Sequence, residues 1–182
     1  GDWSSDVCSS DLAASGGGSD ELFNGGAVDI SGFELYLRRI LVDNGRIQMP
    51  LELSWTSTNS EFQESFDGFW GEVSKGDELP YLPDTMIALN LGLNVDKLSA
   101  NISMKKTSEM RTVAGSGRIA ESNATDELTI IDLGLRYAFQ DNIRLSVGIN
   151  NFMDDDGIAA RRPYGARPTM PRSFSLGVDY TF

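Results

Sequence analysis

Histidine is absent from this chain, and cysteine occurs once, at Cys8. Without histidine, none of the 182 residues can supply the base of a Ser-His-Asp triad or an imidazole ligand for a metal. A single cysteine cannot form an internal disulfide bond. We therefore predict that the chain is not an enzyme and holds no cofactor.

Basic residues and long apolar runs are also scarce. Lysine and arginine total 15 against 27 aspartates and glutamates, which gives a formal net charge of -12 at pH 7. So acidic a chain would repel a polyanion, and we expect no nucleic acid partner. No run approaches the roughly 20 consecutive apolar residues of a membrane-spanning helix. That absence does not decide the environment, because membrane β-strands carry their apolar residues in alternation.

The first twelve residues stand apart from the rest. Residues 2–12, Asp-Trp-Ser-Ser-Asp-Val-Cys-Ser-Ser-Asp-Leu, resemble an in-frame translation of a common sequencing adapter, and the alternative is a polar leader. We interpret residues 1–12 as a sequencing artefact, expect them to be disordered and set them aside. Residues 13–30 are predicted to form a loop rich in glycine and serine and the start of the first strand, and residues 31–182 the folded region.

Alternation of apolar and polar residues predicts β-strands through the folded region. We expect seven strands, at residues 31–41, 48–62, 85–95, 98–105, 131–139, 143–149 and 173–182. Asn44-Gly45 between the first two is typical of a tight turn, because both residues tolerate positive φ. The apolar residues of the first strand are assigned to one face: Phe33, Leu35, Leu37 and Leu41.

The last strand shows the alternation most clearly. Its apolar side chains share one face: Phe174, Leu176, Val178, Tyr180 and Phe182. A strand that crosses the hydrocarbon core needs roughly 9 to 11 residues, apolar toward lipid and small or polar toward a lumen. An aromatic end of this kind resembles bacterial outer-membrane barrels, in which it is part of the signal read by the barrel-assembly machinery. The alternative is the last strand of a soluble sandwich.

The connections favour a membrane barrel over a sandwich. Short turns alternate with long loops at residues 66–85, 114–127 and 154–172. Outer-membrane barrels have short periplasmic turns and long extracellular loops, whereas sandwiches distribute loop lengths over both ends. We therefore predict an all-β, antiparallel transmembrane β-barrel in the outer membrane of a Gram-negative bacterium, in contact with lipid and lipopolysaccharide. Because an open sheet would leave unpaired edges in hydrocarbon, the seven strands must belong to a larger barrel.

Several segments resemble the C-terminal barrel of TonB-dependent receptors, and within that family the ferric-citrate-type transporters. These segments are Phe69-Trp70-Gly71, residues 76–83 (Gly-Asp-Glu-Leu-Pro-Tyr-Leu-Pro), residues 151–154 (Asn-Phe-Met-Asp), residues 161–168 (Arg-Arg-Pro-Tyr-Gly-Ala-Arg-Pro) and the aromatic terminus. The resemblance implies that residues 31–182 are the last seven strands of a barrel of about 22 strands with a plugged lumen. It also implies uptake of a ferric chelate, of siderophore or ferric-citrate type, driven by the TonB complex through an N-terminal plug that this chain lacks.

Positive charge concentrates in one predicted external loop, at Arg161, Arg162 and Arg167. Guanidinium groups suit carboxylates and phosphates, so we predict that these arginines and Tyr164 contact an anionic metal chelate. The alternative is that they pair with residues 154–156 or with lipopolysaccharide phosphates. Tyr81 is a further candidate to stack on a ligand. The run Asp154-Asp155-Asp156-Gly157 lacks the spaced ligands of a calcium loop, and we interpret it as a solvated turn.

Other functions remain open from the sequence. A passive porin or channel would need a lumen constricted by a loop rather than by a plug. A barrel enzyme of the phospholipase or protease kind would need a nucleophile and a base outside this chain. The remaining fold alternative is a soluble β-sandwich that acts as a binding module.

Overall fold

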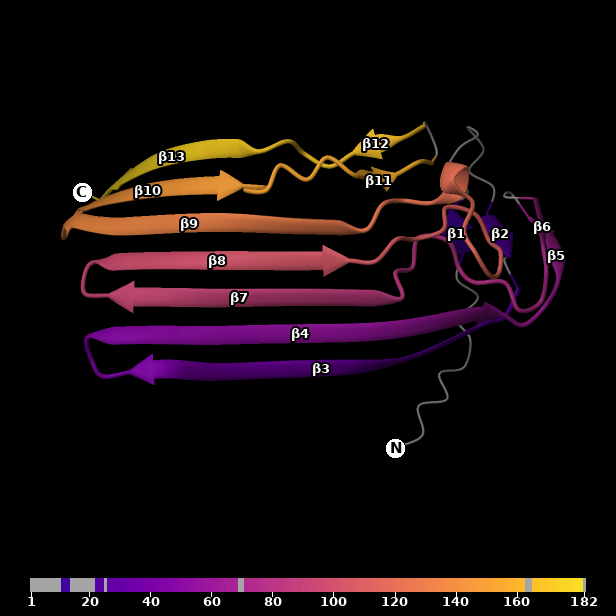
Figure 1. The fold of residues 1–182 in the computed structure, drawn as a ribbon, viewed down its shortest axis with the longest axis horizontal. Helices are drawn as coiled ribbons and strands as arrows, with labels where there is room; N and C mark the ends of the chain where they lie inside the picture. The colour runs from indigo at the N-terminus through magenta and orange to yellow at the C-terminus, as the bar shows by residue number, and fades with distance from the viewer. Residues whose placement is uncertain (1–10, 14–21, 25, 69–70, 163–164, 182) are drawn as a thin grey trace.

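The computed structural model describes residues 11–13, 22–24, 26–68, 71–162 and 165–181. Its main element is a 7-stranded antiparallel sheet in the order β13-β10-β9-β8-β7-β4-β3, in which strands adjacent along the chain pair with each other (Figure 1). The strands are β3 (Val28–Asp43), β4 (Ile47–Phe62), β7 (Thr85–Val95), β8 (Leu98–Thr107), β9 (Leu128–Gln140), β10 (Ile143–Asn150) and β13 (Ser173–Tyr180).

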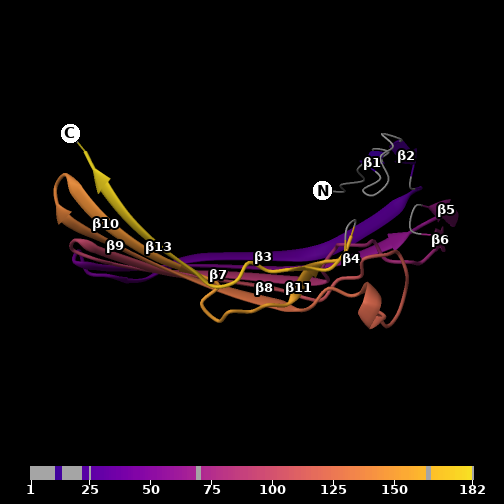
Figure 2. The same cartoon turned by 90° about the horizontal axis from the view of Figure 1, so that it is seen from above.

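The small elements lie in the connections. Three short antiparallel pairs are β1 (Asp11–Ala13) with β2 (Leu22–Asn24), β5 (Phe66–Gly68) with β6 (Gly71–Val73), and β11 (Ile158–Ala160) with β12 (Arg167–Pro168), and a 3-10 turn, η1, spans Glu121–Asn123. They gather at one end of the sheet, whereas the tight turns and the end of β13 lie at the other (Figure 1). The long strands form a single curved layer (Figure 2). Among the described residues, no helix is long and apolar enough to cross a membrane.

All seven strands predicted from the alternation are present. β3 starts earlier than expected, at Val28, and β9 starts at Leu128 rather than at residue 131. Of residues 1–12, the structure describes Asp11 and Leu12, which lie in β1, and the interpretation of the segment as an artefact stays a prediction. The predicted terminal residue Phe182 lies outside the described residues.

The strand register divides the sheet into an apolar and a polar face. One row across five neighbouring strands is apolar: Leu91, Ile102, Leu133, Ile149 and Phe174. The next row, on the opposite face, is small and polar: Gly92, Asn101, Gly134, Gly148 and Ser175. Because paired residues share a face, the period-two pattern of each strand continues across the sheet.

The apolar face is exposed. Leu176 is 80% exposed and Phe174 is 72% exposed, and among the described residues the buried hydrophobic side chains are those of Phe62 and Val73, both outside the middle of the sheet. A sandwich would bury this face against a second sheet. The soluble-sandwich alternative is therefore wrong, because the described residues form one layer whose apolar face has no protein cover.

A β-bulge between Ile40 and Val42 interrupts the alternation of β3. Arg39 lies opposite Leu51 on the apolar face, and beyond the bulge it is Val42 that lies opposite Met49 on that face. A bulge adds one residue to one strand and reverses the side to which later residues point. Leu41 is the residue that has no partner in the register, so its assignment to the face of Phe33, Leu35 and Leu37 stays a prediction.

Pro50 lies on the polar face of β4, next to this bulge. The ladder between β4 and β7 pairs Gln48 with Asn94 and then resumes at Leu51 and Leu91, which accommodates a residue without an N–H group. A Cβ added to Gly92 would lie 2.8 Å from Pro50 Cγ. Glycine at position 92 therefore makes room for the proline ring.

Candidate functional site

Three long connections form the end of the sheet opposite the tight turns. We name them the first loop (residues 63–84, between β4 and β7), the second loop (residues 108–127, between β8 and β9) and the third loop (residues 151–172, between β10 and β13). They include the predicted substrate-binding residues and the segments that carry the family resemblance, apart from the aromatic terminus on β13. Their hydrogen bonds decide which side chains are free to meet a ligand.

The first loop folds back onto the end of β4. Phe62 and Val73 are fully buried there, and the ring of Phe66 meets that of Phe62 edge to face, with centroids 5.3 Å apart. The backbone N–H of Phe62 donates to the carbonyl of Asp77, and Phe62 in turn accepts from the N–H of Gly76, each at 2.8 Å. This small core gives the first loop a fixed shape.

An ion pair joins the second loop to the first. The side chain of Arg111 is only 7% exposed, and its Nε donates to Glu78 Oε2 at 2.7 Å. A second guanidinium nitrogen lies 2.7 Å from the same oxygen and donates to the carbonyl of Gly117 at 3.1 Å. Because the guanidinium bonds both to its partner and within its own loop, it fixes the two loops together.

Tyr81 joins all three loops. Its backbone N–H donates to the carbonyl of Arg111 in the second loop at 2.9 Å. Its phenol oxygen accepts from the backbone N–H groups of Arg161 at 3.3 Å and Arg162 at 2.8 Å in the third loop. The hydroxyl of Tyr81 thus has a structural role, and stacking of its ring on a ligand stays a prediction, since the residue is 38% exposed.

Asn151 organises the start of the third loop. It is buried and has a positive φ of 50°. Its Nδ2 donates to the carbonyls of Asp155 at 2.9 Å and Met170 at 2.8 Å, and its Oδ1 accepts from the N–H of Asp155 at 3.0 Å. One amide side chain therefore closes a turn and ties it to a segment 19 residues later.

The acidic run at residues 154–156 belongs to the same turn. Asp154 accepts from the backbone N–H of Arg172 at 2.8 Å and lies 3.5 Å from its guanidinium. Asp155 accepts from the N–H of Thr129 at 2.8 Å. Among the described residues, no group of acidic side chains is placed to hold a metal ion. These hydrogen bonds give the run a structural role in the third loop.

The predicted substrate-binding arginines separate into two kinds. Arg161 donates from Nε to the carbonyl of Ala124, so its guanidinium connects the third loop to the second loop. Arg162 and Arg167 are exposed, and Arg167 donates to the carbonyl of Arg162 at 2.5 Å. In the described part of the chain, none of these arginines forms an ion pair with residues 154–156, since Asp154 pairs with Arg172. Tyr164 lies outside the described residues.

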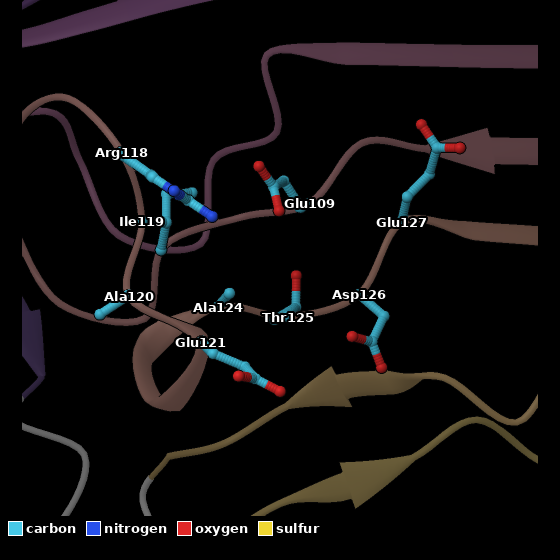
Figure 3. Close-up of a pocket in the computed structure, with 9 residues that line it drawn as sticks. All are labelled: Glu109, Arg118, Ile119, Ala120, Glu121, Ala124, Thr125, Asp126 and Glu127. Atoms are coloured by element: carbon cyan, nitrogen blue, oxygen red, sulfur yellow. The ribbon is translucent and has the colours of Figure 1, made fainter.

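The sequence interpretation missed a hollow beside the second loop. Glu109, Glu121, Asp126 and Glu127 surround a cavity of about 640 Å³, with Arg118 at its edge (Figure 3). Glu127 also pairs with Lys106 at 2.8 Å. The sequence signal was the density of acidic residues in a long polar segment, but only the fold brings Glu109 beside the others. The negative potential of this hollow contrasts with the exposed guanidinium groups of the third loop.

The predicted assembly residues lie together on β13. Phe174, Leu176, Val178 and Tyr180 are all exposed on the apolar face of the sheet. They meet Ile149, Val147, Leu145 and Ile143 of β10 in register. The structure places no protein element over this row within the described residues.

Solved structures share this fold. The chain matches the ferric yersiniabactin uptake receptor FyuA from Yersinia pestis at TM-score 0.68 and 15% identity, covering 87% of this chain and 24% of that one. It matches the outer membrane transporter YddB from Escherichia coli at 0.62 and 17%, with 87% and 26% covered. For the ferric enterobactin receptor PfeA from Pseudomonas aeruginosa the values are 0.60 and 18%, with 84% and 22% covered. The chain thus spans about a quarter of each of these proteins.

Sequence comparison identifies the family. No curated protein matches the chain closely. The family model described as "TonB dependent receptor-like, beta-barrel" matches residues 5–152, which is most of the chain. The match begins inside the segment that resembles a sequencing adapter, so it leaves the origin of that segment open. The seven-stranded meander with its exposed apolar face belongs to the TonB-dependent receptor-like β-barrel family.

Proposed function

We propose that the chain is part of the wall of a transporter in the outer membrane of a Gram-negative bacterium, and that this transporter takes up a ferric chelate. The observation that carries the proposal is the sheet itself. None of the described residues covers its apolar face, while long, mutually bonded loops gather at one end and tight turns at the other. That arrangement suits a barrel with external loops and periplasmic turns.

The height of the apolar band supports the membrane placement. On the apolar face of β4, the residues from Ile47 to Trp55 are apolar or aromatic, and the pattern becomes polar at Ser57, Asn59 and Glu61. These nine residues at about 3.3 Å each, tilted by about 40°, rise roughly 23 Å. This is close to the roughly 25 Å height of the lipid-facing band of outer-membrane barrels. Trp55 and Phe33, whose rings lie 5.6 Å apart, mark its outer margin.

The two edges of the sheet support a larger barrel. Within the described residues, β3 and β13 each have a neighbouring strand on one side only. Unsatisfied backbone groups cost several kcal/mol each in hydrocarbon, so we propose that these edges pair with further strands of a longer receptor. The exposed row on β13 would be read by the barrel-assembly machinery, and the receptor would connect to the TonB complex through a plug domain.

The third loop supplies the proposed substrate contact. Arg162 and Arg167 are exposed cations in an otherwise acidic protein, and the described residues offer them no carboxylate partner. Guanidinium groups bind carboxylate and phenolate oxygens through charge-assisted hydrogen bonds. We therefore propose an anionic ferric chelate of siderophore or ferric-citrate type. Arg161 is left out of this contact because it is half-buried and donates to Ala124 in the second loop, whereas Arg167 is exposed although it donates to Arg162.

Uptake by the full-length receptor tests the proposal. In cells without other receptors for the chelate, we expect iron-limited growth to depend on both the receptor and TonB. Replacing Arg162 and Arg167 together with glutamine should weaken chelate binding at least tenfold, since a hydrogen bond to a charged group contributes about 1.5–3 kcal/mol. Arg118→Gln is the matched control, because it removes an exposed arginine from the second loop.

The possible outcomes separate the two parts of the proposal. Uptake that persists without TonB would reject active transport and favour a passive channel. Unchanged chelate affinity in the double variant, with TonB-dependent uptake intact, would reject the arginine contact alone.

A further inference from the structure

The apolar face carries two cations that the proposed function does not use, and one of them has no carboxylate partner among the described residues. Within the described residues of this face, charged side chains inside the apolar band are those of Arg39 on β3 and Lys106 on β8. Lys106 lies opposite Ile87 near the outer margin, and it pairs with Glu127 at 2.8 Å. Arg39 lies deeper, opposite Leu51 and in the same row as Leu91.

Arg39 is close enough to one margin of the band to reach water. The bulge takes up one of the residues between Arg39 and Asp43, the last residue of β3, because their partners Leu51 and Gln48 are three residues apart. Three residues of a strand tilted by about 40° rise roughly 8 Å. An arginine buries its aliphatic stem along an apolar surface and extends its charged end toward the interface. An arginine at this position can therefore extend its guanidinium to headgroup depth on the side of the tight turns.

The nearby charges are already paired, on the other face or in the turns. Arg38 lies 3.3 Å from Glu52 on the polar face. Arg46 lies 3.0 Å from Asp96, which joins the two neighbouring turns. Asp43 accepts from the N–H of Gly45 at 3.2 Å. The ion pairs of the described residues thus leave Arg39 without a carboxylate.

We propose that Arg39 binds the phosphate of a phospholipid headgroup in the leaflet that surrounds the tight turns. An uncompensated arginine on a lipid-facing strand destabilises a membrane barrel, and the effect falls toward the interface. A guanidinium group forms two parallel hydrogen bonds to a phosphate, which compensates its charge at headgroup depth. The inference rests on the proposed membrane placement and not on the transported substrate.

Lipid retention by the full-length receptor tests this site. The receptor is purified in detergent, and binding of phosphatidylglycerol is measured by native mass spectrometry. We expect Arg39→Leu to weaken lipid retention about tenfold. Arg39→Lys should weaken it less, because lysine keeps the positive charge but cannot form two parallel hydrogen bonds to one phosphate. The matched control Arg38→Gln, one residue away on the polar face, should retain lipid like the unmodified receptor. Excess inorganic phosphate should not displace the lipid.

Thermal stability in vesicles provides the second readout. Adding phosphatidylglycerol to phosphatidylcholine vesicles should raise the unfolding temperature of the receptor and of Arg38→Gln, but not that of Arg39→Leu. Equal lipid retention by Arg39→Leu and the receptor would overturn the proposal. So would an equal loss of stability by Arg39→Leu in detergent and in both kinds of vesicle, because that result would identify a protein carboxylate on an adjoining strand as the partner.

Discussion

Asn151 shows how one side chain can determine the shape of a loop. Both hydrogens of its amide and its oxygen are bonded to backbone groups of Asp155 and Met170, and its own N–H donates to Asp132 Oδ1 at 2.8 Å. Asparagine is one of the few residues with a side chain that tolerates the left-handed backbone conformation. Position 151 therefore requires both this backbone conformation and these hydrogen bonds, which a smaller residue cannot supply.

Asn151→Ala should destabilise the third loop by roughly 2 to 4 kcal/mol, because it removes three hydrogen bonds and places a less tolerant residue at positive φ. The temperature at which the full-length receptor loses its compact form in electrophoresis measures the effect. Asn150→Ala is the control, since Asn150 is exposed and donates only to Ser173 Oγ at 3.2 Å in the described contacts. Equal unfolding temperatures for the two variants would contradict this role.

The sequence identifies Asn151 as part of a family-like segment but does not reveal what it does. Its partners Met170 and Asp132 lie 19 residues away on either side, and no local pattern connects them. The same limit applies to Arg161, which the sequence groups with Arg162 by charge. Only the fold shows that a carbonyl of the second loop accepts from Arg161.

At the scale of the element, close packing on the polar face depends on glycine. A Cβ added to Gly134 would lie 2.2 Å from Asn101 Oδ1, on the paired position of β8. A Cβ at Gly32 would lie 2.5 Å from the backbone oxygen of Ser57. The first clash involves a side chain that can be shortened, and the second involves backbone that cannot. A second substitution can therefore relieve the clash at position 134 but not the clash at position 32.

Gly134→Ala and Gly32→Ala should each cost about 1–3 kcal/mol through overpacking. Asn101→Ala, added to Gly134→Ala, should restore most of the lost stability, because it removes the clashing atoms. The same Asn101→Ala change should not help Gly32→Ala. Urea unfolding of the full-length receptor in lipid vesicles checks this double-mutant cycle, and rescue of both variants or of neither would contradict it.

The strands were predictable because their determinants are local. Period-two alternation places β7 at its observed bounds, and Asn44-Gly45 identifies a turn in which Gly45 has a φ of 80°. The bulge of β3 was not predictable, because Ile40, Leu41 and Val42 form an apolar run that fits either face. The side to which Leu41 points depends on pairing with β4, which the alternation of β3 alone does not specify.

At the scale of the whole molecule, the two faces of one sheet meet different surroundings. In the part of the chain that the structure describes, nothing covers the apolar face, whereas the polar face is lined by small residues such as Gly134, Gly148 and Ser175. The same charge should therefore have opposite consequences on the two faces. A soluble sheet protein would show no such dependence on lipid.

Leu135→Arg should destabilise the inserted receptor by up to about 2–4 kcal/mol, the cost of a lipid-facing arginine at the middle of the membrane, which falls toward the interface. Ser103→Arg is the control, because Ser103 lies opposite Asp132 on the polar face, where the new charge gains a partner. The amount of each variant that reaches the outer membrane, followed by urea unfolding in vesicles, gives the measurement. Equal tolerance of both arginines would contradict the membrane orientation.

The contact between Pro50 and Gly92 links two positions that are far apart in the sequence. Pro50 Cγ occupies the space in which any other residue at position 92 would place its Cβ. Substitutions at positions 50 and 92 are therefore expected to depend on each other. A lineage that replaces Gly92 must first lose the proline ring, and one that keeps the ring must keep the glycine, so correlated substitution at positions 50 and 92 would record this packing in the evolutionary history of the family.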